Sequence, residues 1–289
     1  MPAAPARYFA AMKSLLRKAY YAVPVGLRGV VRRLYYLPLD LLRPLPAGAP
    51  PRGKIYTGGD GEELLAQGVE LVRVMRERGL LDDDTAVLDI GSGIGRFALA
   101  LAAAGHRGPY EGFDVVATGV AWCEANITRE HPNFSFRHVE LANDLYTGRG
   151  ASAREFTFPY AADRFDLLVA NSVFTHMLSD EVSRYVREGA RVARPGARGY
   201  FTAFILDEAS RAAMYDGGGF VFGHPYGEHA RLLDAEVKRA NVAYERDWLL
   251  AEFAAAGWRV DEVLRGRWSG LPGDDPVAFQ DVVLATRVA

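Results

Sequence analysis

The sequence contains a single cysteine, Cys123, among its 289 residues. One cysteine excludes an intramolecular disulfide and a metal site built from several thiolates. No apolar run reaches the roughly 18 residues that a membrane-spanning helix needs. The first residues also show no long apolar segment followed by a cleavage site, as a secretory signal would. We therefore expect a cytoplasmic protein, and we expect no metal ion in its site.

The chain also lacks a marked excess of charge of either sign. It has 34 Lys and Arg against 36 Asp and Glu, a formal net charge of −2, which gives no reason to expect nucleic acid as a partner. Hydrophobic residues make up 49% of the sequence. That supply is enough to bury a full α/β core in one domain, with some residues left for an appendage.

Residues 7–43 are basic and aromatic, with Asp40 as the only acid. Such a mixture is typical of a helix that contacts a membrane surface or a partner. It also fits a helical arm that packs on its own or a neighbouring subunit. Pro24, Gly26 and Gly29 are expected to interrupt any long amphipathic helix, which favours the packed arm.

Prolines from Pro38 to Pro51 predict a linker after this arm. We therefore divide the chain into a basic aromatic arm with its linker, residues 1–53, and a main domain, residues 54–289. A helix is predicted from about Glu62 to Arg78, because apolar residues recur there at helical spacing.

The most informative stretch is residues 85–105, TAVLDIGSGIGRFALALAAAG. Thr85–Ile90 is a short apolar run of strand type, Gly91-Ser92-Gly93-Ile94-Gly95 is a glycine-rich turn, and Arg96–Ala104 is a helix. Glycines let the backbone approach a ligand closely, and the amides of a helix start attract electron-rich groups. This order predicts the first βα unit of a nucleotide-binding α/β fold.

The spacing of the turn indicates which nucleotide. A dinucleotide fingerprint needs glycine at position 96, where this chain has Arg96. Asp89 stands at the strand end, where a dinucleotide-binding strand is usually apolar. A carboxylate there can accept from the turn amides or contact a cationic ligand.

The stretch VLDIGSGIGR resembles motif I of the class I, seven-strand S-adenosylmethionine-dependent methyltransferases. With GFDVV, HPNFSF and SVFTHM, the chain looks like a bacterial small-molecule or glycan methyltransferase over roughly residues 54–289. The resemblance implies a doubly wound, seven-stranded, mostly parallel sheet with an antiparallel last strand. It implies S-adenosylmethionine as cofactor, held by Asp89, Gly91, Ser92, Gly93, Gly95 and Arg96.

Two further strands are expected to end at the cofactor. Tyr110–Asp114 ends on an acid at the place where ribose hydroxyls are held, although Asp114 also suits the N-cap of the next helix. Phe134–Val139 is the third strand. Glu140 and Leu141 follow it, where the resembled family reads the adenine.

The fourth strand is predicted at Phe165–Ala170. Ligands in open α/β sheets lie beyond the carboxyl ends of the strands, so the next residues, including Asn171 and His176, should reach the site. His176 is either a structural histidine or a general base. Asp207 and His224 are the reserve candidates. A metal site at His224 is disfavoured, because no helix holds it on one face with other ligands.

The rest of the chain completes the predicted sheet. Ser179 should cap a helix, and Arg198–Leu206 should be the fifth strand after a helix end at Pro195-Gly196. A helix over Tyr244–Ala256 and strands at Trp258–Leu264 and Val277–Arg287 follow, the last strand antiparallel. The polar connection 146–164 either serves the site or is a solvated insertion.

The resemblance implies transfer of a methyl group to a small-molecule acceptor. Because relatives of this appearance often accompany glycosyltransferases, the acceptor is expected to be a hydroxyl of a sugar or glycan. Two alternatives remain: an NAD(P)-dependent oxidoreductase, and a catalytically silent methyltransferase-like subunit that binds a partner through its arm. The arm is thus expected to contact a membrane surface or another subunit.

Overall fold

The computed structural model describes residue 23 and residues 25–43, 45–46, 48–56, 61–143, 150–216, 219–274 and 278–288. Predictions that fall on residues 1–22, on 144–149 and on the start of the last strand at 275–277 lie outside the described residues.

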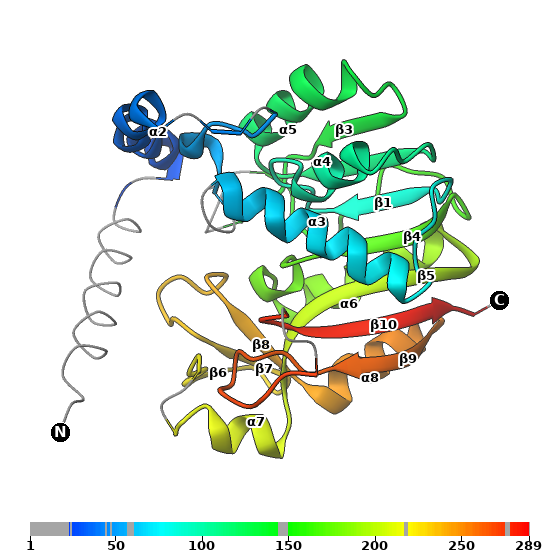
Figure 1. Cartoon of the computed structure of the whole chain (residues 1–289). Helices are drawn as coiled ribbons and strands as arrows, with labels where there is room; N and C mark the ends of the chain where they lie inside the picture. Colours follow the sequence, from blue (N-terminus) through cyan, green and yellow to red (C-terminus); the bar gives the residue numbers. More distant parts are fainter. Residues whose placement is uncertain are drawn as a thin grey trace.

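The described helices cover both faces of one central sheet (Figure 1). They are α2 Val25–Leu42, η1 Arg52–Lys54, α3 Gly61–Glu77, α4 Arg96–Ala103, α5 Ala117–Cys123, η2 Glu124–Thr128, η3 Phe174–His176, α6 Ser179–Val192, α7 Glu208–Ala213 and α8 Arg246–Ala255. The strands are β1 Val87–Ile90, β2 Tyr110–Asp114, β3 Phe134–His138, β4 Phe165–Ala170, β5 Ala193–Leu206, β6 His224–Tyr226, β7 Ala230–Leu232, β8 Val242–Glu245, β9 Trp258–Leu264 and β10 Asp281–Arg287.

Seven strands run in the order β3-β2-β1-β4-β5-β10-β9. The first five are parallel, whereas β10 is antiparallel to both β5 and β9. The doubly wound, mostly parallel sheet with an antiparallel last strand is therefore confirmed. Three short strands, β8, β7 and β6, extend the sheet from the end of β5 to a total of ten strands.

Apolar side chains on the two faces of the sheet form two large cores. On one face, Leu64 of α3 and Leu101 of α4 pack with Val87 and Leu167. On the other face, α6 and α8 pack over the neighbouring strand residues. The two cores hold the strands rigidly, so the loops at their carboxyl ends have fixed positions.

Several boundaries differ from the sequence predictions, three of them with a clear structural reason. Strand β5 begins at Ala193 rather than after Gly196, and a register shift against β4 accommodates the extra residues. Tyr244 belongs to β8 rather than to a helix. Ser179 is the first residue of α6 rather than its cap, because the backbone N–H of Leu178 donates to Glu181 Oε2 at 2.7 Å.

The prediction that Gly26 and Gly29 interrupt the N-terminal helix is wrong, whereas Pro24 lies outside the described residues. Helix α2 runs without a break through Gly29 and Pro38. Pro38 is a helix residue rather than part of a linker, and the linker begins after Leu42. Within the described residues, no helix combines the length and apolarity needed to cross a membrane.

The connection between β3 and β4 is exposed over most of its described residues, but part of it packs in the core. Phe158 and Tyr160 are buried around Phe113 of β2, with ring centroids 5.0 and 6.3 Å away. The backbone N–H of Phe158 donates to Glu188 of α6 at 2.9 Å. This part of the connection is therefore a component of the core.

Candidate active site

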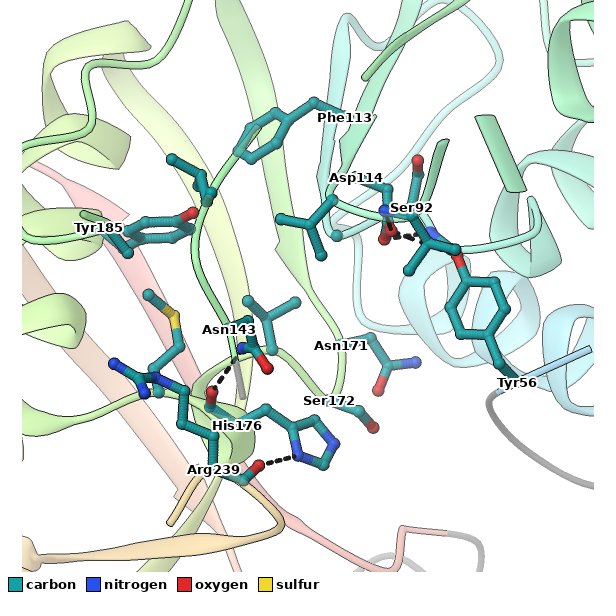
Figure 2. Close-up of a pocket in the computed structure, with 18 of the residues that line it drawn as sticks. Tyr56, Ser92, Phe113, Asp114, Asn143, Asn171, Ser172, His176, Tyr185 and Arg239 are labelled. Atoms are coloured by element: carbon teal, nitrogen blue, oxygen red, sulfur yellow. Dashed lines mark hydrogen bonds between the residues drawn. The ribbon is translucent and has the colours of Figure 1, made fainter. Parts of the chain in front are cut away.

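A cavity of about 440 Å³ opens where β1, β2 and β4 end, and that volume suits a small-molecule ligand. One side is formed by the glycine turn and the end of β2, and the other by the loop after β4 and residues 239–241. Figure 2 shows Tyr56, Ser92 and Asp114 on the first side, facing His176, Arg239 and Tyr185 on the second. The cavity thus lies at the carboxyl ends of the strands, where topology places the ligand of an open α/β sheet.

The turn after β1 has the backbone conformation that requires glycine. Gly91 and Gly93 have φ of 72° and 61° and line the cavity. A Cβ on Gly91 would lie 2.6 Å from Val173 Cγ2. Gly95 lies outside the lining, as the residue before α4 with φ of 81°, and its Cβ would lie 2.7 Å from Ile127 Cδ1. Side chains at these positions would displace the turn from the ligand space.

Ser92 offers a polar group for a ligand. Its side chain is buried and lines the cavity, and Ser92 Oγ has no hydrogen-bond partner among the described residues. Buried hydroxyls are nearly always hydrogen-bonded in folded proteins. The turn therefore fits a ligand that supplies this partner, as a nucleoside cofactor can.

Asp114 fixes the turn against the end of β2. Asp114 Oδ2 accepts from the backbone N–H of Gly93 at 2.9 Å, and Oδ1 accepts from Val116 N–H at 2.8 Å and Tyr56 Oη at 3.2 Å. Burial raises the pKa of this carboxyl, and the two backbone donors oppose that rise. The side chain lines the cavity, as the ribose role requires, and it is also bound to the start of α5.

Replacing Asp114 with alanine is expected to weaken binding of S-adenosylhomocysteine by about 1–3 kcal/mol, because polar ligand groups lose their acceptor. Calorimetry measures this change. Asp166→Ala is the matched control, since Asp166 accepts from Ala86 N–H at 3.0 Å outside the cavity. Both variants should lose some thermal stability. Unchanged affinity in Asp114→Ala would show that the carboxylate only holds the turn.

Only some of the other predicted cofactor residues line the cavity. Arg96 and Asn171 line the cavity, and so does Leu141. Asp89 is buried outside the lining and accepts from Tyr110 Oη. Burial raises its pKa to about 7. Glu140 is exposed and also outside the lining. Asp89 thus hydrogen-bonds to the neighbouring strand β2 instead of contacting the amides of the turn.

His176 lies at the end of η3 with its ring in the cavity lining. Its Nδ1 is 3.0 Å from the carbonyl oxygen of Arg239 (Figure 2). Because a carbonyl only accepts, Nδ1 carries the hydrogen, and the neutral ring has its lone pair on Nε2. Burial lowers the pKa of His176 below its usual value, so the ring is neutral near pH 7. This is the protonation state that a general base needs.

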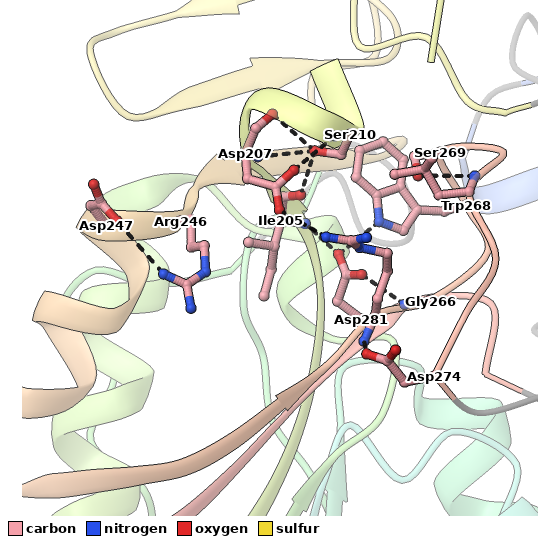
Figure 3. A network of polar contacts seen from close by, with 12 residues as sticks. Ile205, Asp207, Ser210, Arg246, Asp247, Gly266, Trp268, Ser269, Asp274 and Asp281 are labelled. Carbon is pink, nitrogen blue, oxygen red and sulfur yellow. Dashed lines mark hydrogen bonds and ion pairs between the residues drawn. The ribbon is translucent and has the colours of Figure 1, made fainter. Parts of the chain in front are cut away.

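The two reserve candidates lie away from this cavity. Asp207 caps α7, where its Oδ1 accepts from Ser210 N–H at 2.7 Å and its Oδ2 from Arg265 at 3.4 Å (Figure 3). His224 is exposed on β6 and is not part of the lining. The structure therefore brings neither residue together with His176.

A buried ion pair beside His176 was not predicted. Arg239 donates to Glu181 of α6 from Nε at 3.1 Å and from Nη2 at 2.6 Å. Both residues line the cavity, and their side chains are 18% and 3% exposed. The pair holds the backbone carbonyl that orients His176. Glu181 and Arg239 are 58 positions apart, and Arg239 lies in a segment without a motif. No sequence pattern therefore pairs the two residues.

Ser172 lies in the loop after β4 that was expected to reach the site, but its backbone conformation was not predicted. It has φ of 62°, a left-handed conformation that is strained for a side chain other than glycine. Its backbone N–H donates to Thr202 Oγ1 at 2.7 Å, and its hydroxyl contacts Gln280 Oε1 at 3.2 Å. These contacts fix the loop between Asn171 and His176. Among the described residues, no three His, Cys, Asp or Glu side chains form a metal-binding group.

Comparisons with known proteins agree with this geometry. Residues 88–201 match the family described as methyltransferase domain. The release factor glutamine methyltransferase of Shewanella oneidensis is 24% identical over 200 residues, which are 67% of this chain and 61% of that protein. The chain thus spans less than two thirds of the length of this curated relative.

Two solved structures share the fold over most of the chain. The 1,6-didemethyltoxoflavin-N1-methyltransferase of Burkholderia thailandensis, solved with bound S-adenosylhomocysteine, is 16% identical with a TM-score of 0.50. The alignment covers 100% of this chain and 92% of that one. The [4+2]-cyclase SpnF is 18% identical with a TM-score of 0.52, over 90% of this chain and 95% of that one.

The family match covers the strands and turns that build the cavity, from β1 into β5. Around it, the sheet has the order and the antiparallel last strand of the class I methyltransferase fold. Residues 88–201 are therefore similar to a methyltransferase domain, and the chain shares the α/β fold of these solved structures.

Proposed function

We propose that the protein transfers the methyl group of S-adenosylmethionine to a hydroxyl of a small-molecule acceptor, a sugar or a glycan. The observation that carries this proposal is the position of His176. A neutral imidazole with a fixed tautomer lines the same cavity as the glycine turn and Asp114. A hydroxyl needs a base more than most acceptors do, since it is a poor nucleophile near neutral pH.

The residues of the cavity would have different roles in such a reaction. The bound cofactor supplies an electrophilic methyl group on a positively charged sulfur. The glycine turn, Ser92 and Asp114 would hold it on one side. His176 would take the hydroxyl proton at Nε2 on the other side, while the Glu181–Arg239 pair keeps the imidazole in place. Positioning of this kind supplies much of the acceleration in a two-substrate reaction.

Cofactor binding separates this proposal from the oxidoreductase alternative. We expect S-adenosylhomocysteine to bind in the micromolar range, about −8 kcal/mol, because the turn has Arg96 where a dinucleotide fold needs glycine. Isothermal titration calorimetry with S-adenosylhomocysteine and, in parallel, with NAD⁺ and NADP⁺ measures this. Tight binding of a dinucleotide with no response to S-adenosylhomocysteine would overturn the proposal.

Product analysis tests the acceptor. Incubation with a deuterated methyl donor and a panel of free sugars and glycans should give an O-methylated product, detected by mass. A protein of the same fold is named a [4+2]-cyclase, so the fold alone does not establish methyl transfer. Labelled product on amines or carboxylates alone, or cofactor binding without any transfer, would contradict a hydroxyl acceptor.

A further inference from the structure

Helix α2 directs its apolar side chains outward. Leu34 is 65% exposed, Tyr35 and Leu41 are each 75% exposed, and Leu42 is 80% exposed. These side chains recur at helical spacing with four others on the same side of the helix. We call the set the α2 apolar face: Leu27, Val30, Val31, Leu34, Tyr35, Leu37, Leu41 and Leu42.

The polar side of α2 packs on the chain instead. Asp40 accepts from Arg52 of η1 at 2.8 Å, and the same guanidinium donates to the carbonyl of Arg43 at 2.7 Å. Arg28 is buried and Arg32 lines the active-site cavity. A helix at the surface of a globular protein normally packs its apolar side on the core. Here that arrangement is reversed, so the apolar face is turned away from the domain.

A second copy of the chain is the alternative occupant of this face. The helix has 18 residues, about 27 Å of length at 1.5 Å per residue, and a protein partner would have to match the shape of the face along that length. A lipid bilayer has no such requirement, because it needs no shape complementarity.

The charge of the surrounding sequence favours lipid as well. Residues 7–43 contain eight Lys and Arg against the single acid Asp40, in a chain whose formal net charge is −2. Tyr35 adds an aromatic ring of the kind found at membrane–water interfaces. Among the described residues, Arg33 and Arg43 are exposed on and just after α2. Basic residues beside an apolar helix face are attracted to anionic headgroups, and the two effects add.

We propose that the α2 apolar face lies in the headgroup region of an anionic membrane surface and attaches the domain peripherally to it. The helix would lie in the plane of the membrane, with η1 and the domain on the aqueous side. This attachment is independent of the reaction that the cavity catalyses.

Vesicle cosedimentation with the full chain tests the proposal. Wild-type protein should sediment with vesicles of phosphatidylcholine and phosphatidylglycerol, and markedly less with phosphatidylcholine alone. The double variant Leu34→Gln and Leu41→Gln should reduce the bound fraction at least tenfold without a change of charge. Val69→Gln with Tyr215→Gln is the matched control, since these side chains are 60% and 59% exposed on α3 and just after α7.

A parallel measurement keeps the outcome clear if folding is affected. All variants should keep the melting transition and the S-adenosylhomocysteine affinity of wild type, because none of the four residues lines the cavity. Equal vesicle binding by the α2 variant and the control would overturn the proposal. Absence of vesicle binding in wild type would also overturn it. Sedimentation velocity would then distinguish two other occupants of the face: a second copy, if the α2 variant dissociates a dimer, or the chain's own residues 1–22, if the protein is a monomer.

Discussion

Replacing His176 with alanine is expected to lower kcat about 100-fold or more, the usual loss when a general base is removed. The reason is geometric: the imidazole lines the cavity opposite the glycine turn, and the Arg239 carbonyl fixes its tautomer. Affinity for S-adenosylhomocysteine should stay close to that of wild type. Steady-state kinetics and calorimetry on the same preparation separate the two effects.

The pH profile gives this prediction a second readout. A base acts in its neutral form, so the wild-type rate should fall as pH decreases through the pKa of His176. Burial lowers that pKa, which places the acid limb below the usual histidine value of about 6.5. His176→Ala should lose this limb, whereas His224→Ala should keep both limb and rate, because His224 is exposed outside the cavity. A variant at 176 that keeps the limb would identify the histidine as structural.

Replacing Glu181 with alanine should destabilise the fold by about 3–5 kcal/mol, the typical cost of leaving one partner of a buried ion pair without its counter-charge. Arg239 would remain largely buried without its carboxylate, and Leu178 N–H would lose its acceptor. Urea unfolding measures the free-energy change. Asp84→Ala is the control for an exposed pair, since Asp84 and Arg107 are 71% and 63% exposed, and its cost should be at most about 1 kcal/mol.

A double-mutant cycle shows whether the pair acts as a unit. Glu181→Ala and Arg239→Ala together should cost clearly less than the sum of the single changes, because the second removes a charge that the first left unpaired. The kcat of each single variant should fall as well, since the carbonyl that orients His176 belongs to Arg239. Additive costs in the cycle would contradict a coupled pair.

Elements with strong local signals were predicted almost to the residue. Strands β2 and β4 have the predicted bounds, because each is a short apolar run bounded by polar residues or turns. The glycine turn was predicted as one side of the cavity, and its glycines have the positive φ angles that favour this residue. The position of the cavity at the carboxyl ends of the strands followed from topology.

The errors have physical causes as well. Gly29 and Pro38 have low helix propensity, yet contacts with η1 hold α2 in one helix through both. Val242–Glu245 became a strand because β5 and β7 offer it backbone partners, which no local pattern reveals. The strain at Ser172 depends on Thr202 and Gln280, which are distant in sequence. Sequence patterns describe neighbours along the chain, and these features depend on neighbours in space.

The position of β10 has a consequence for how the protein is made. This strand lies between β5 and β9, and the residue before it, Gln280, contacts the cavity loop at Ser172. During synthesis the ribosome releases β5 long before β10, so one edge of β5 stays open until nearly the whole domain has emerged. Open edges of this kind invite aggregation. A nascent chain stopped before residue 280 should therefore depend on a chaperone and bind no cofactor.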